Sequence, residues 1–367
     1  MFADFGAIIL AAGFSSRMED FKPLMLLQGR TLLHWAVQCF QQAGIPQPLV
    51  VTGHGAPQVR QAAQALGVPT IHNPDYHQGM FSSVRKGVST LKHKHIQAFF
   101  VLPVDIPLVR PATISALIQA WQGQMVLPVF EGQQGHPPLI PATLIKDILA
   151  HDGQGGLRAV LAKHPARELF VWDQGILLDV DTHSDFQILE TRATRLKIGT
   201  RAEALALAKL HMPQRGLAHG QAVAQMALGL AQKINDCGFN LDLDLVHNAA
   251  LLHDIGKGQP QHEQAGARLL SDLGLTGLTQ IVASHKDVPP PASGILTEKE
   301  VVYLADKLMH CDQRVSIEDR FQEKLNKYAQ DSRATQAIVG RLSHALAMAQ
   351  LFENICGQSV NKIQLSK

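Results

Sequence analysis

The chain of 367 residues contains little cysteine. Its four cysteines lie far apart, and no two of them form a C-x-x-C pair. This spacing argues against a disulfide framework and against a thiolate zinc knuckle, because both need cysteines in clusters or close pairs. We therefore expect reduced thiols in the protein core, at Cys39, Cys237, Cys311 and Cys356.

Long apolar runs and strong net charge are missing as well. No apolar run approaches the length of a membrane span, and residues 1–5 lack the basic region of a signal peptide. The formal net charge is only +2, from 33 Lys and Arg against 31 Asp and Glu. Proteins that bind nucleic acid or anionic membranes usually concentrate basic residues on one face. We therefore expect a cytoplasmic protein with small-molecule partners, no nucleic acid and no membrane, and we leave its oligomeric state open.

Two common nucleotide motifs are also absent near the N-terminus. The sequence has neither the G-x-x-x-x-G-K-[ST] of a P-loop nor the G-x-G-x-x-G of a dinucleotide fold, so ATPase and dehydrogenase functions lose their usual support. Instead, the apolar run 7–9 leads into the segment 10–22, LAAGFSSRMEDFK. A glycine there lets the backbone approach an anion, and the polar residues add donors and positive charge. The segment predicts a phosphate-binding turn that uses Gly13, Ser15, Ser16, Arg17 and Lys22.

The pattern of the chain changes near residue 190. Before it, short β-rich runs alternate with amphipathic stretches, which predicts a mostly parallel sheet with helices on both faces. The segment 191–200 is poor in apolar residues and marks a boundary, so we expect domains at 1–197 and 198–367, the second all-α. The predicted strands are 7–9, 49–52, 98–104, 125–129 and 169–172; the predicted helices are 32–43, 59–66, 112–121, 202–210, 221–234, 243–253, 263–273, 298–311, 317–328 and 334–355.

Two acidic residues stand where the first domain is expected to bind ligands. Asp105 follows the predicted strand 98–104, and Asp181 closes a later apolar run, so both are expected at strand ends. Functional residues of open α/β sheets gather at the carboxyl edge of the strands. Two carboxylates there could hold Mg²⁺ against the phosphates of a nucleotide, although an aspartate at a strand end also serves as an ordinary helix cap or turn residue.

Five segments together resemble the MobA-like nucleotidyltransferases, and within them the molybdenum cofactor cytidylyltransferase branch. They are LAAG…SSRM…K at 10–22, Asn73-Pro74 with GMFSS at 79–83, the stretch 103–108, Gly135-His136-Pro137, and DVDT at 179–182. The resemblance covers about residues 6–190. It implies a Rossmann-like α/β nucleotidyltransferase domain that uses Mg²⁺ to transfer a nucleotidyl group from an NTP to a phosphorylated acceptor, with release of pyrophosphate.

The resemblance also implies roles for individual residues. By this resemblance, Asp105 and Asp181 would be the Mg²⁺ ligands, and Arg17 and Lys22 would be catalytic cations. Ala12 resembles the branch of the family that uses CTP rather than GTP, and the acceptor would be the molybdopterin cofactor. Two positions depart from the family pattern, with Glu19 in place of glycine and His183 in place of proline. The implied nucleotide-binding residues are Leu10, Ala11, Ala12, Gly13, Ser15, Arg17, Lys22, Asn73, Gly79, Ser82, Ser83 and Asp105.

A second set of residues predicts a metal site in the helical half. His253 and Asp254 are adjacent at a predicted helix end, with His219 upstream and Asp306 downstream. This ordered H…HD…D set resembles the HD-domain metal-dependent phosphohydrolases over about residues 216–325. Mixed histidine and carboxylate ligands suit Mn²⁺, Fe or another divalent transition metal, which would turn water into a nucleophile for phosphate esters.

Three further residues extend this predicted site. His262 and His285 resemble the additional ligands of two-metal HD enzymes, and Lys257 could contact a substrate phosphate as a catalytic residue. Each has a simpler explanation: histidines are common in this chain, and Lys257 could be a solvated lysine near a helix end. Whether the centre holds one metal or two stays open at this stage.

The sequence thus predicts a bifunctional enzyme, with nucleotidyl transfer in the first half and phosphate hydrolysis in the second. Two alternatives remain. The acceptor could be a sugar or alditol phosphate, because the sequence does not reveal the shape of the acceptor pocket. The HD half could also be a nucleotide-sensing regulatory module that binds metal and ligand without turnover.

Overall fold

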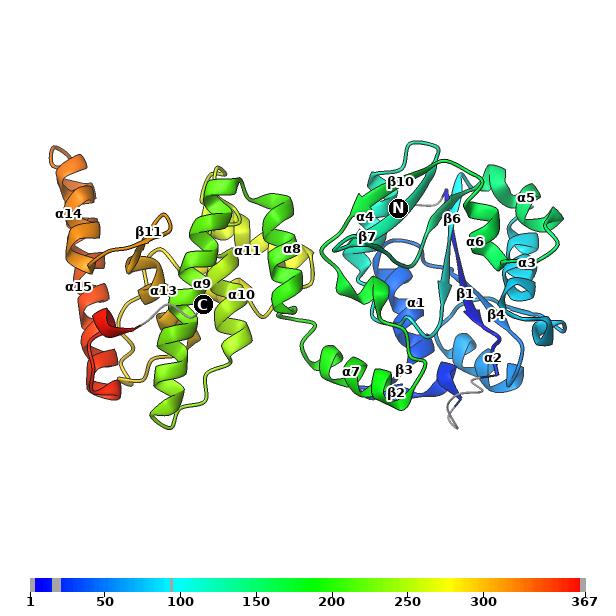
Figure 1. Cartoon of the computed structure of the whole chain (residues 1–367), viewed down its shortest axis with the longest axis horizontal. Coiled ribbons are helices and arrows are strands. Elements are labelled where there is room, and N and C mark those ends of the chain that lie inside the picture. The colour runs from blue at the N-terminus through cyan, green and yellow to red at the C-terminus, as the bar shows by residue number, and fades with distance from the viewer. Residues whose placement is uncertain (1–3, 15–20, 93–94, 364–367) are drawn as a thin grey trace. The chain divides into compact units, whose positions relative to one another are not determined.

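The computed structural model describes residues 4–14, 21–92 and 95–363. The chain separates into two compact units, residues 1–194 and 195–367. The first is an α/β unit built on a sheet, and the second is helical (Figure 1). The predicted fold classes are therefore confirmed.

The N-terminal unit is built around an eight-stranded sheet. Its order is β10-β7-β9-β6-β1-β4-β5, and β8 pairs with β7. Strands β1, β4, β5 and β6 are parallel, and so are β7 and β10, whereas β9 and β8 run antiparallel to their neighbours. The strands are β1 (Phe5–Ala11), β4 (Leu49–Thr52), β5 (Thr70–His72), β6 (Ala98–Pro103), β7 (Met125–Phe130), β8 (Gln133–Gln134), β9 (Leu139–Pro141) and β10 (Ala166–Phe170), beside a small hairpin of β2 (Leu26–Leu27) and β3 (Arg30–Thr31).

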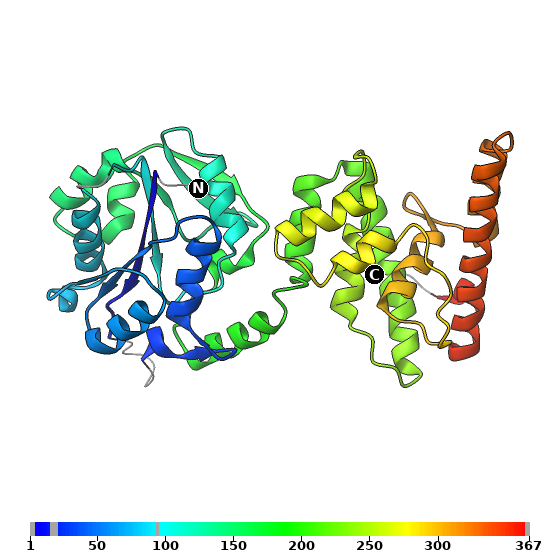
Figure 2. The ribbon, with the colours of Figure 1, turned by 180° about the vertical axis from the view of Figure 1, so that it is seen from behind.

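Helices cover both faces of this sheet (Figures 1 and 2). Helices α1 and α4 pack together on one face, and α3, α5 and α6 pack together on the other. Ile8 and Leu10 of β1 point into the core beneath α3, as the alternation of side chains along a strand requires. The helices are α1 (Leu32–Gln42), α2 (Ala56–Ala65), α3 (Met80–Leu91), α4 (Pro111–Gln119), α5 (Ile145–Ala150), α6 (Gly156–Leu161) and α7 (His183–Thr194).

The C-terminal unit is a set of helices whose ends carry clear capping signals. Thr200 and Glu203 form a capping box at α8, and Thr297 and Glu300 form another at α13, which satisfies backbone N–H groups at both helix starts. Gly357 ends α15 with a φ of 64°. The helices are α8 (Arg201–His211), α9 (Gln214–Asp236), α10 (Leu243–Leu252), α11 (His262–Asp272), α12 (Thr279–Ser284), α13 (Glu298–Lys307), α14 (Ile317–Lys327) and α15 (Ser332–Cys356).

Several predicted elements differ from the observed ones. The helix predicted over 298–311 ends at Lys307, and a two-stranded hairpin follows it, β11 (Met309–His310) with β12 (Gln313–Arg314). Cys311 turns this hairpin with a φ of 55°. Helix α9 begins at Gln214 rather than 221, directly after Pro213. Helices α3, α5, α6, α7 and α12 and the short strands β2, β3, β5, β8 and β9 were not predicted. The shortest of these elements carry too little periodicity to be recognised, whereas α3 and α7, with 12 residues each, were missed despite their length.

The expectation of core thiols holds for one cysteine only. Cys39 is buried in α1, whereas Cys237 is exposed and Cys311 and Cys356 are partly exposed. The apolar character of cysteine does not decide its place at a helix end or a turn, where these three residues lie. All four are free thiols.

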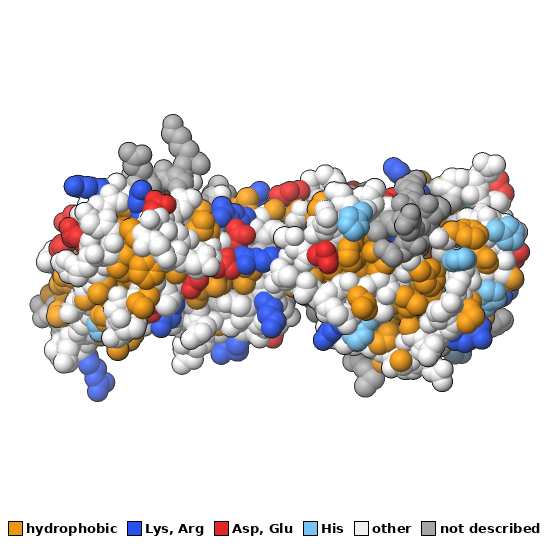
Figure 3. All heavy atoms as spheres, turned by 90° about the horizontal axis from the view of Figure 1, so that it is seen from below, with side chains coloured by type: hydrophobic (Ala, Val, Ile, Leu, Met, Phe, Trp, Pro, Cys, Tyr) orange, Lys and Arg blue, Asp and Glu red, His pale blue; other side chains and the backbone are white. Residues whose placement is uncertain are grey.

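In the part of the chain that the structure describes, every helix is too short or too polar to span a bilayer. On the face of the C-terminal unit seen in Figure 3, basic and acidic side chains are interspersed.

Candidate nucleotide site and candidate metal centre

The described part of the predicted phosphate-binding segment lines a cavity of about 290 Å³. Leu10 and Ala11 end β1, and Ala12 and Gly13 follow it, with the backbone of Gly13 open to space on its Cβ side. The predicted residues Ser15, Ser16, Arg17 and Glu19 lie outside the described residues. The cavity is also lined by Lys22, Gly79, Ser83 and Asp105.

Lys22 and Asp105, which line this cavity, meet a third charged side chain, that of Asp181. The Lys22 ammonium lies 3.0 Å from Asp181 Oδ1 and 3.7 Å from Asp105 Oδ2. Burial raises the pKa of Asp105, and the charge of Lys22 offsets this only in part. Two carboxylates drawn toward one cation are the hard oxygen ligands that Mg²⁺ prefers, so this donor set fits the metal.

The two aspartates reach this place by different routes. Asp105 directly follows β6, as predicted. Asp181 does not end a strand: it lies in the loop before α7, because residues 174–177 form a 3₁₀ turn instead of a strand. The loop is fixed by the N–H of Val180, which donates to the carbonyl of Asp105 at 3.0 Å. The expectation of two strand ends is therefore wrong, although the two carboxylates lie together.

A carboxylate that the sequence analysis missed shapes the same loop. Asp185 accepts hydrogen bonds from the N–H groups of Asp181 and Thr182, at 3.2 and 2.7 Å, and from the Thr182 hydroxyl at 2.8 Å. The T-x-x-D pattern at 182–185 is a helix-start signal that could have revealed it. His183, where the family pattern has proline, is the first residue of α7.

The predicted residues around α3 form a hydrogen-bonded group. The Asn73 amide donates to the hydroxyls of Ser82 and Ser83, at 2.9 and 3.0 Å. Its backbone N–H also donates to the carbonyl of Thr52, at 2.8 Å. Gly79 precedes α3 with a φ of 96°, a conformation that favours glycine. Asn73 thus ties the end of β5 to the start of α3 beside the cavity.

In the C-terminal unit, the six predicted metal ligands lie together. Two groups of side chains have ligand atoms within 4.8 Å of one another: His219, His253 and Asp254 form one, and Asp254, His262 and His285 form the other. Asp254 belongs to both groups. Asp306 lies against the first group, with its Oδ1 3.3 Å from Nε2 of His219 and 3.7 Å from Nε2 of His253.

The two oxygens of Asp254 face different histidines. Oδ1 lies 3.5 Å from Nε2 of both His262 and His285, and Oδ2 lies 3.7 Å from Nε2 of His253. One carboxylate therefore stands between two sets of imidazoles. Asp254 could therefore supply a ligand atom to each of two metal positions.

Hydrogen bonds fix the orientation of three of the imidazole rings. In each, Nδ1 lies next to a backbone carbonyl oxygen, which only accepts, so Nδ1 carries the proton and Nε2 keeps its lone pair for a metal. The fourth ring, His262, places Nδ1 3.6 Å from Oε2 of Glu263. The distances to the carbonyls are 2.7 Å from His219 to Cys311, 2.6 Å from His253 to Ala250, and 2.7 Å from His285 to Val282.

The protonation states suit metal binding. Burial lowers the pKa of His253 to about 4, so this ring is neutral at neutral pH. Burial acts to raise the pKa of Asp306, but Lys307, His219, His253 and Arg320 together outweigh it and hold the pKa well below its usual range. The pKa of Asp254 is likewise lowered, because the hydrogen bond from His285, together with His253 and Lys257, outweighs burial. Neutral imidazoles and ionised carboxylates are the ligand forms that divalent metals bind.

Three cations surround the acidic ligands. Lys257 donates to Oδ2 of Asp254 at 2.5 Å, so the predicted catalytic lysine reaches the metal ligand itself. Lys307 and Arg320 donate to Asp306 at 2.6 and 3.2 Å. The sequence analysis missed both, because Lys307 stands beside a ligand in an ordinary helix and Arg320 comes from the next helix along the chain.

Two glycines allow the segments that carry the candidate ligands to pack closely against one another. A Cβ on Gly256 would lie 2.2 Å from the carbonyl oxygen of His262, so only glycine lets the turn after Asp254 meet the start of α11. A Cβ on Gly220 would lie 2.4 Å from the carbonyl oxygen of Leu251, which lets α9 and α10 pack closely beside His219.

Comparison with known families agrees with this division of the chain. Residues 7–168 match the MobA-like NTP transferase domain, and residues 216–309 match the HD domain. The chain joins a MobA-like NTP transferase domain to an HD domain. Asp105 lies within the first match; His219, Asp254 and Asp306 lie within the second, and Asp181 follows the end of the first.

Known relatives cover about half of the chain or less. The chain is 28% identical over 193 residues to the molybdenum cofactor cytidylyltransferase of Escherichia coli. This alignment covers 52% of the present chain and 97% of the Escherichia coli protein. It is 30% identical over 145 residues to the uncharacterized protein MJ0778 of Methanocaldococcus jannaschii, covering 34% of this chain and 86% of that one. The solved structure of Rv0371c from Mycobacterium tuberculosis aligns with a TM-score of 0.46 at 26% identity, covering 52% of this chain and all of that one.

The HD match ends at residue 309, before α14 and α15 begin. Both helices nevertheless contribute to the HD centre, because Arg320 of α14 binds Asp306 and Arg341 of α15 lines the pocket that contains the candidate ligands. The HD domain of this chain therefore has a wall that lies beyond the matched segment.

Proposed function

We propose that the MobA-like domain transfers a cytidylyl group from CTP to a phosphorylated acceptor of the molybdopterin class, with Mg²⁺. The observation that carries this is the meeting of Lys22 with both Asp105 and Asp181, beside the 290 Å³ cavity that Lys22 and Asp105 line. Ala12 and the cytidylyltransferase named among the relatives support CTP as the donor. In this reaction an acceptor phosphate oxygen bonds to the α-phosphorus, and the bond to the β-phosphate breaks to release pyrophosphate.

The chain's own residues would bind and orient the nucleotide. Mg²⁺ held by Asp105 and Asp181 would offset the charge of the α-phosphate. The open backbone at Gly13 lets phosphates approach closely, and Lys22 supplies a cation to the same end of the cavity. Asn73 keeps the start of α3 in place through Ser82 and Ser83. Positioning and electrostatics of this kind dominate catalysis of phosphoryl-type transfer.

The test is pyrophosphate release by the full chain, with each of the four NTPs, Mg²⁺ and a molybdopterin-containing acceptor. We expect turnover with CTP. Faster turnover with GTP would overturn the proposed base, and turnover only with sugar or alditol phosphates would overturn the proposed acceptor. No pyrophosphate from any pair would overturn the transfer reaction itself.

For the HD domain we propose hydrolysis of a phosphate ester or anhydride at a dinuclear centre of Mn²⁺, Fe or a similar ion. The place of Asp254 in both ligand groups carries this proposal. Divalent ions held there would act as Lewis acids and lower the pKa of water near the phosphate. His219 and His253 would hold one position and His262 and His285 the other. In His219, His253 and His285 a backbone carbonyl binds Nδ1, which leaves Nε2 of each of these rings to bind the metal.

Metal analysis and hydrolysis assays test this second proposal. We expect two equivalents of transition metal per chain, and Mn²⁺-dependent release of p-nitrophenol from p-nitrophenyl phosphate. One equivalent would overturn the dinuclear assignment. Bound metal without hydrolysis of any phosphate ester or nucleotide would instead favour the regulatory module.

A further inference from the structure

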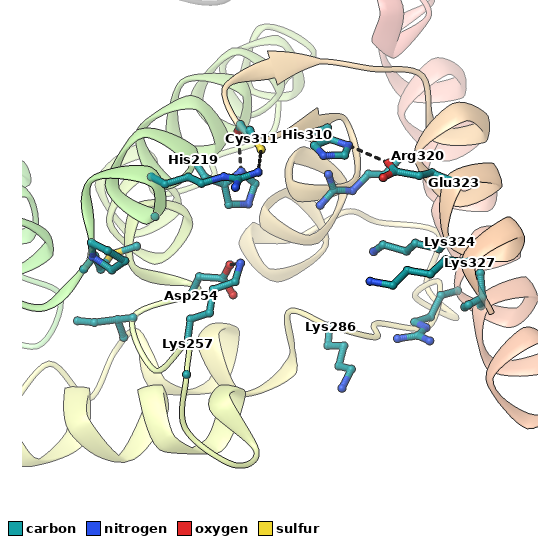
Figure 4. Close-up of a pocket in the computed structure, with 18 of the residues that line it drawn as sticks. His219, Asp254, Lys257, Lys286, His310, Cys311, Arg320, Glu323, Lys324 and Lys327 are labelled. Carbon is teal, nitrogen blue, oxygen red and sulfur yellow. Dashed lines mark hydrogen bonds and ion pairs between the residues drawn. The ribbon is translucent and has the colours of Figure 1, made fainter. Parts of the chain in front are cut away.

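A large cavity adjoins the HD centre and extends beyond it. Its volume is about 920 Å³, near the upper end of the range for small-molecule sites. His219 and Asp254 line one part of it, and α14 and α15 line another. In Figure 4, Lys324 and Lys327 extend from α14 toward the side of the cavity that holds His219 and Asp254. A phosphomonoester alone would leave most of this space empty.

The wall formed by α14 and α15 is strongly basic. Lys324, Lys327 and Arg341 line the cavity, and Lys286 and Arg215 face it from other segments. The acidic lining residues are already engaged: Asp254 belongs to the metal centre, and Glu323 lies 3.2 Å from His310.

The basic side chains lie on one face of α14. Arg320, Lys324 and Lys327 are spaced by four and three residues, which aligns them along a helix. Such like-charged neighbours destabilise an isolated helix. Arg320 is held by Asp306, but in the described part of the chain no carboxylate pairs with Lys324, Lys327 or Arg341.

The pKa of Lys324 reflects the closeness of these positive charges. Burial, together with the charges of Arg320 and Lys307, lowers it to about 8. A bound anion would relieve this repulsion, because an opposite charge nearby favours the charged form of a lysine. The cationic side chains around Lys324 therefore repel one another, and a negatively charged ligand would remove this repulsion.

We propose that Lys324, Lys327 and Arg341 form an anion subsite for a second phosphate group of the ligand whose reacting phosphate lies at the HD centre. The ligand class is a nucleotide-sized molecule with at least two phosphate groups, such as a nucleoside polyphosphate. Lysine and arginine side chains recognise phosphate by charge-assisted hydrogen bonds. This inference rests on the proposed hydrolase function, and it adds a subsite on helices beyond the matched HD segment.

The test compares a probe that reaches the subsite with one that does not. Full-length protein hydrolyses p-nitrophenyl phosphate at constant free Mn²⁺, and inorganic tripolyphosphate is added as a competitive inhibitor. Lys324→Gln and Lys327→Gln each remove one cation of the subsite. Arg333→Gln removes an exposed cation of α15 that does not line the cavity, and serves as the matched control.

We expect each subsite variant to raise the inhibition constant of tripolyphosphate about tenfold, the effect of one lost charge-assisted hydrogen bond. The KM for p-nitrophenyl phosphate should stay within about twofold, and Arg333→Gln should change neither constant. An unchanged inhibition constant would overturn the subsite. Equal increases in both constants would also overturn it, because the lysines would then act on the reacting phosphate.

A second measurement separates this inference from the hydrolase proposal. If the wild-type protein hydrolyses no ester, the proposed function fails, and tripolyphosphate binding is then measured directly by calorimetry. Weaker binding by Lys324→Gln and Lys327→Gln, but not by Arg333→Gln, would support the subsite alone. Equal binding by all four proteins would refute it.

Discussion

The two sites of this chain balance their charges in opposite ways. In the N-terminal cavity, the charge of Lys22 is shared by Asp105 and Asp181, and burial leaves the pKa of Asp105 raised. In the HD centre, cations and imidazoles outweigh burial, and the pKa values of Asp254 and Asp306 are lowered. A carboxylate whose pKa is raised, such as Asp105, gains most from an added cation, whereas carboxylates whose pKa is lowered, such as Asp254 and Asp306, stay ionised without one.

The sites also differ in how firmly their ligands are held. Asp181 reaches its place through a loop fixed by Val180 and Asp185. The HD ligands His219, His253 and His285 instead lie in or at the ends of helices, each with its ring fixed by a backbone carbonyl. Preorganised ligands lose less entropy when a metal binds. We therefore expect the HD centre to retain metal through purification, and the N-terminal site to require added Mg²⁺.

The largest expected effect separates the two sites completely. Asp254→Asn removes the carboxylate that belongs to both groups of candidate ligands, so hydrolysis should fall about 10³-fold and bound transition metal should be lost. Cytidylyl transfer should stay within about twofold. Elemental analysis and both activity assays measure this, with Asp272→Asn at the exposed end of α11 as control. Full hydrolysis by Asp254→Asn would contradict the proposed centre.

The reverse experiment uses the N-terminal site. Asp105→Asn removes a proposed Mg²⁺ ligand beside Lys22, and pyrophosphate release should fall about 10² to 10³-fold. Hydrolysis at the HD centre should not change. Asp152→Asn, an exposed carboxylate of the same unit, is the control for loss of one charge. Equal loss of both activities would show that the sites do not act independently.

A smaller effect tests how the second metal position is assembled. Gly256→Ala would place a Cβ 2.2 Å from the carbonyl oxygen of His262 and push α11 away. We expect bound metal to fall from two equivalents to one, and stability to fall by about 1 to 3 kcal/mol. Gly340→Ala is the matched control, since a Cβ there meets nothing within 4 Å and alanine favours helix. Two retained equivalents would mean that α11 does not set this position.

The smallest effect concerns a carboxylate outside both sites. Asp242 caps α10 and binds Arg195 at 2.6 Å through both oxygens. Burial acts to raise the pKa of Asp242, but Arg195 and the backbone N–H of Leu245 outweigh it, so the pKa is lowered. A lowered pKa in the folded state gives stability above the unfolded pKa of about 3.9, and this stability is lost as the pH falls through the folded pKa.

We therefore expect Asp242→Ala to destabilise α10 by about 1 kcal/mol at pH 7. The difference from wild type should shrink as the pH falls below about 4. Because Asp242 and Arg195 are each 32% exposed, solvent limits the share of the ion pair in this value. Amide hydrogen exchange in α10, followed at pH 7 and below about pH 4, measures the effect. A difference that grew at low pH would contradict the stated cause.

Much of the fold follows from local patterns. The run 49–52 predicts β4 residue for residue, and α10 and α14 begin at the predicted positions, where Asp242 and Ser316 cap them. The predictions failed where the signal was short or interrupted, as at β9 and at the hairpin after Lys307, and they also missed the longer helices α3 and α7. A strand of two or three residues carries too little pattern, since its neighbours in the sheet decide its conformation.

For the candidate sites, too, the sequence determined some features and the tertiary structure determined others. The sequence by itself named His219, His253, Asp254, His262, His285 and Asp306 as ligands, because their residue types and order carry the chemistry. Only the tertiary structure decided that Asp254 stands between two groups of imidazoles, and that Arg320 of α14 reaches Asp306. It also decided that Asp181 meets Lys22 from a loop. Chemical identity is local to a residue, whereas the distance between residues far apart in the chain depends on how helices and strands pack.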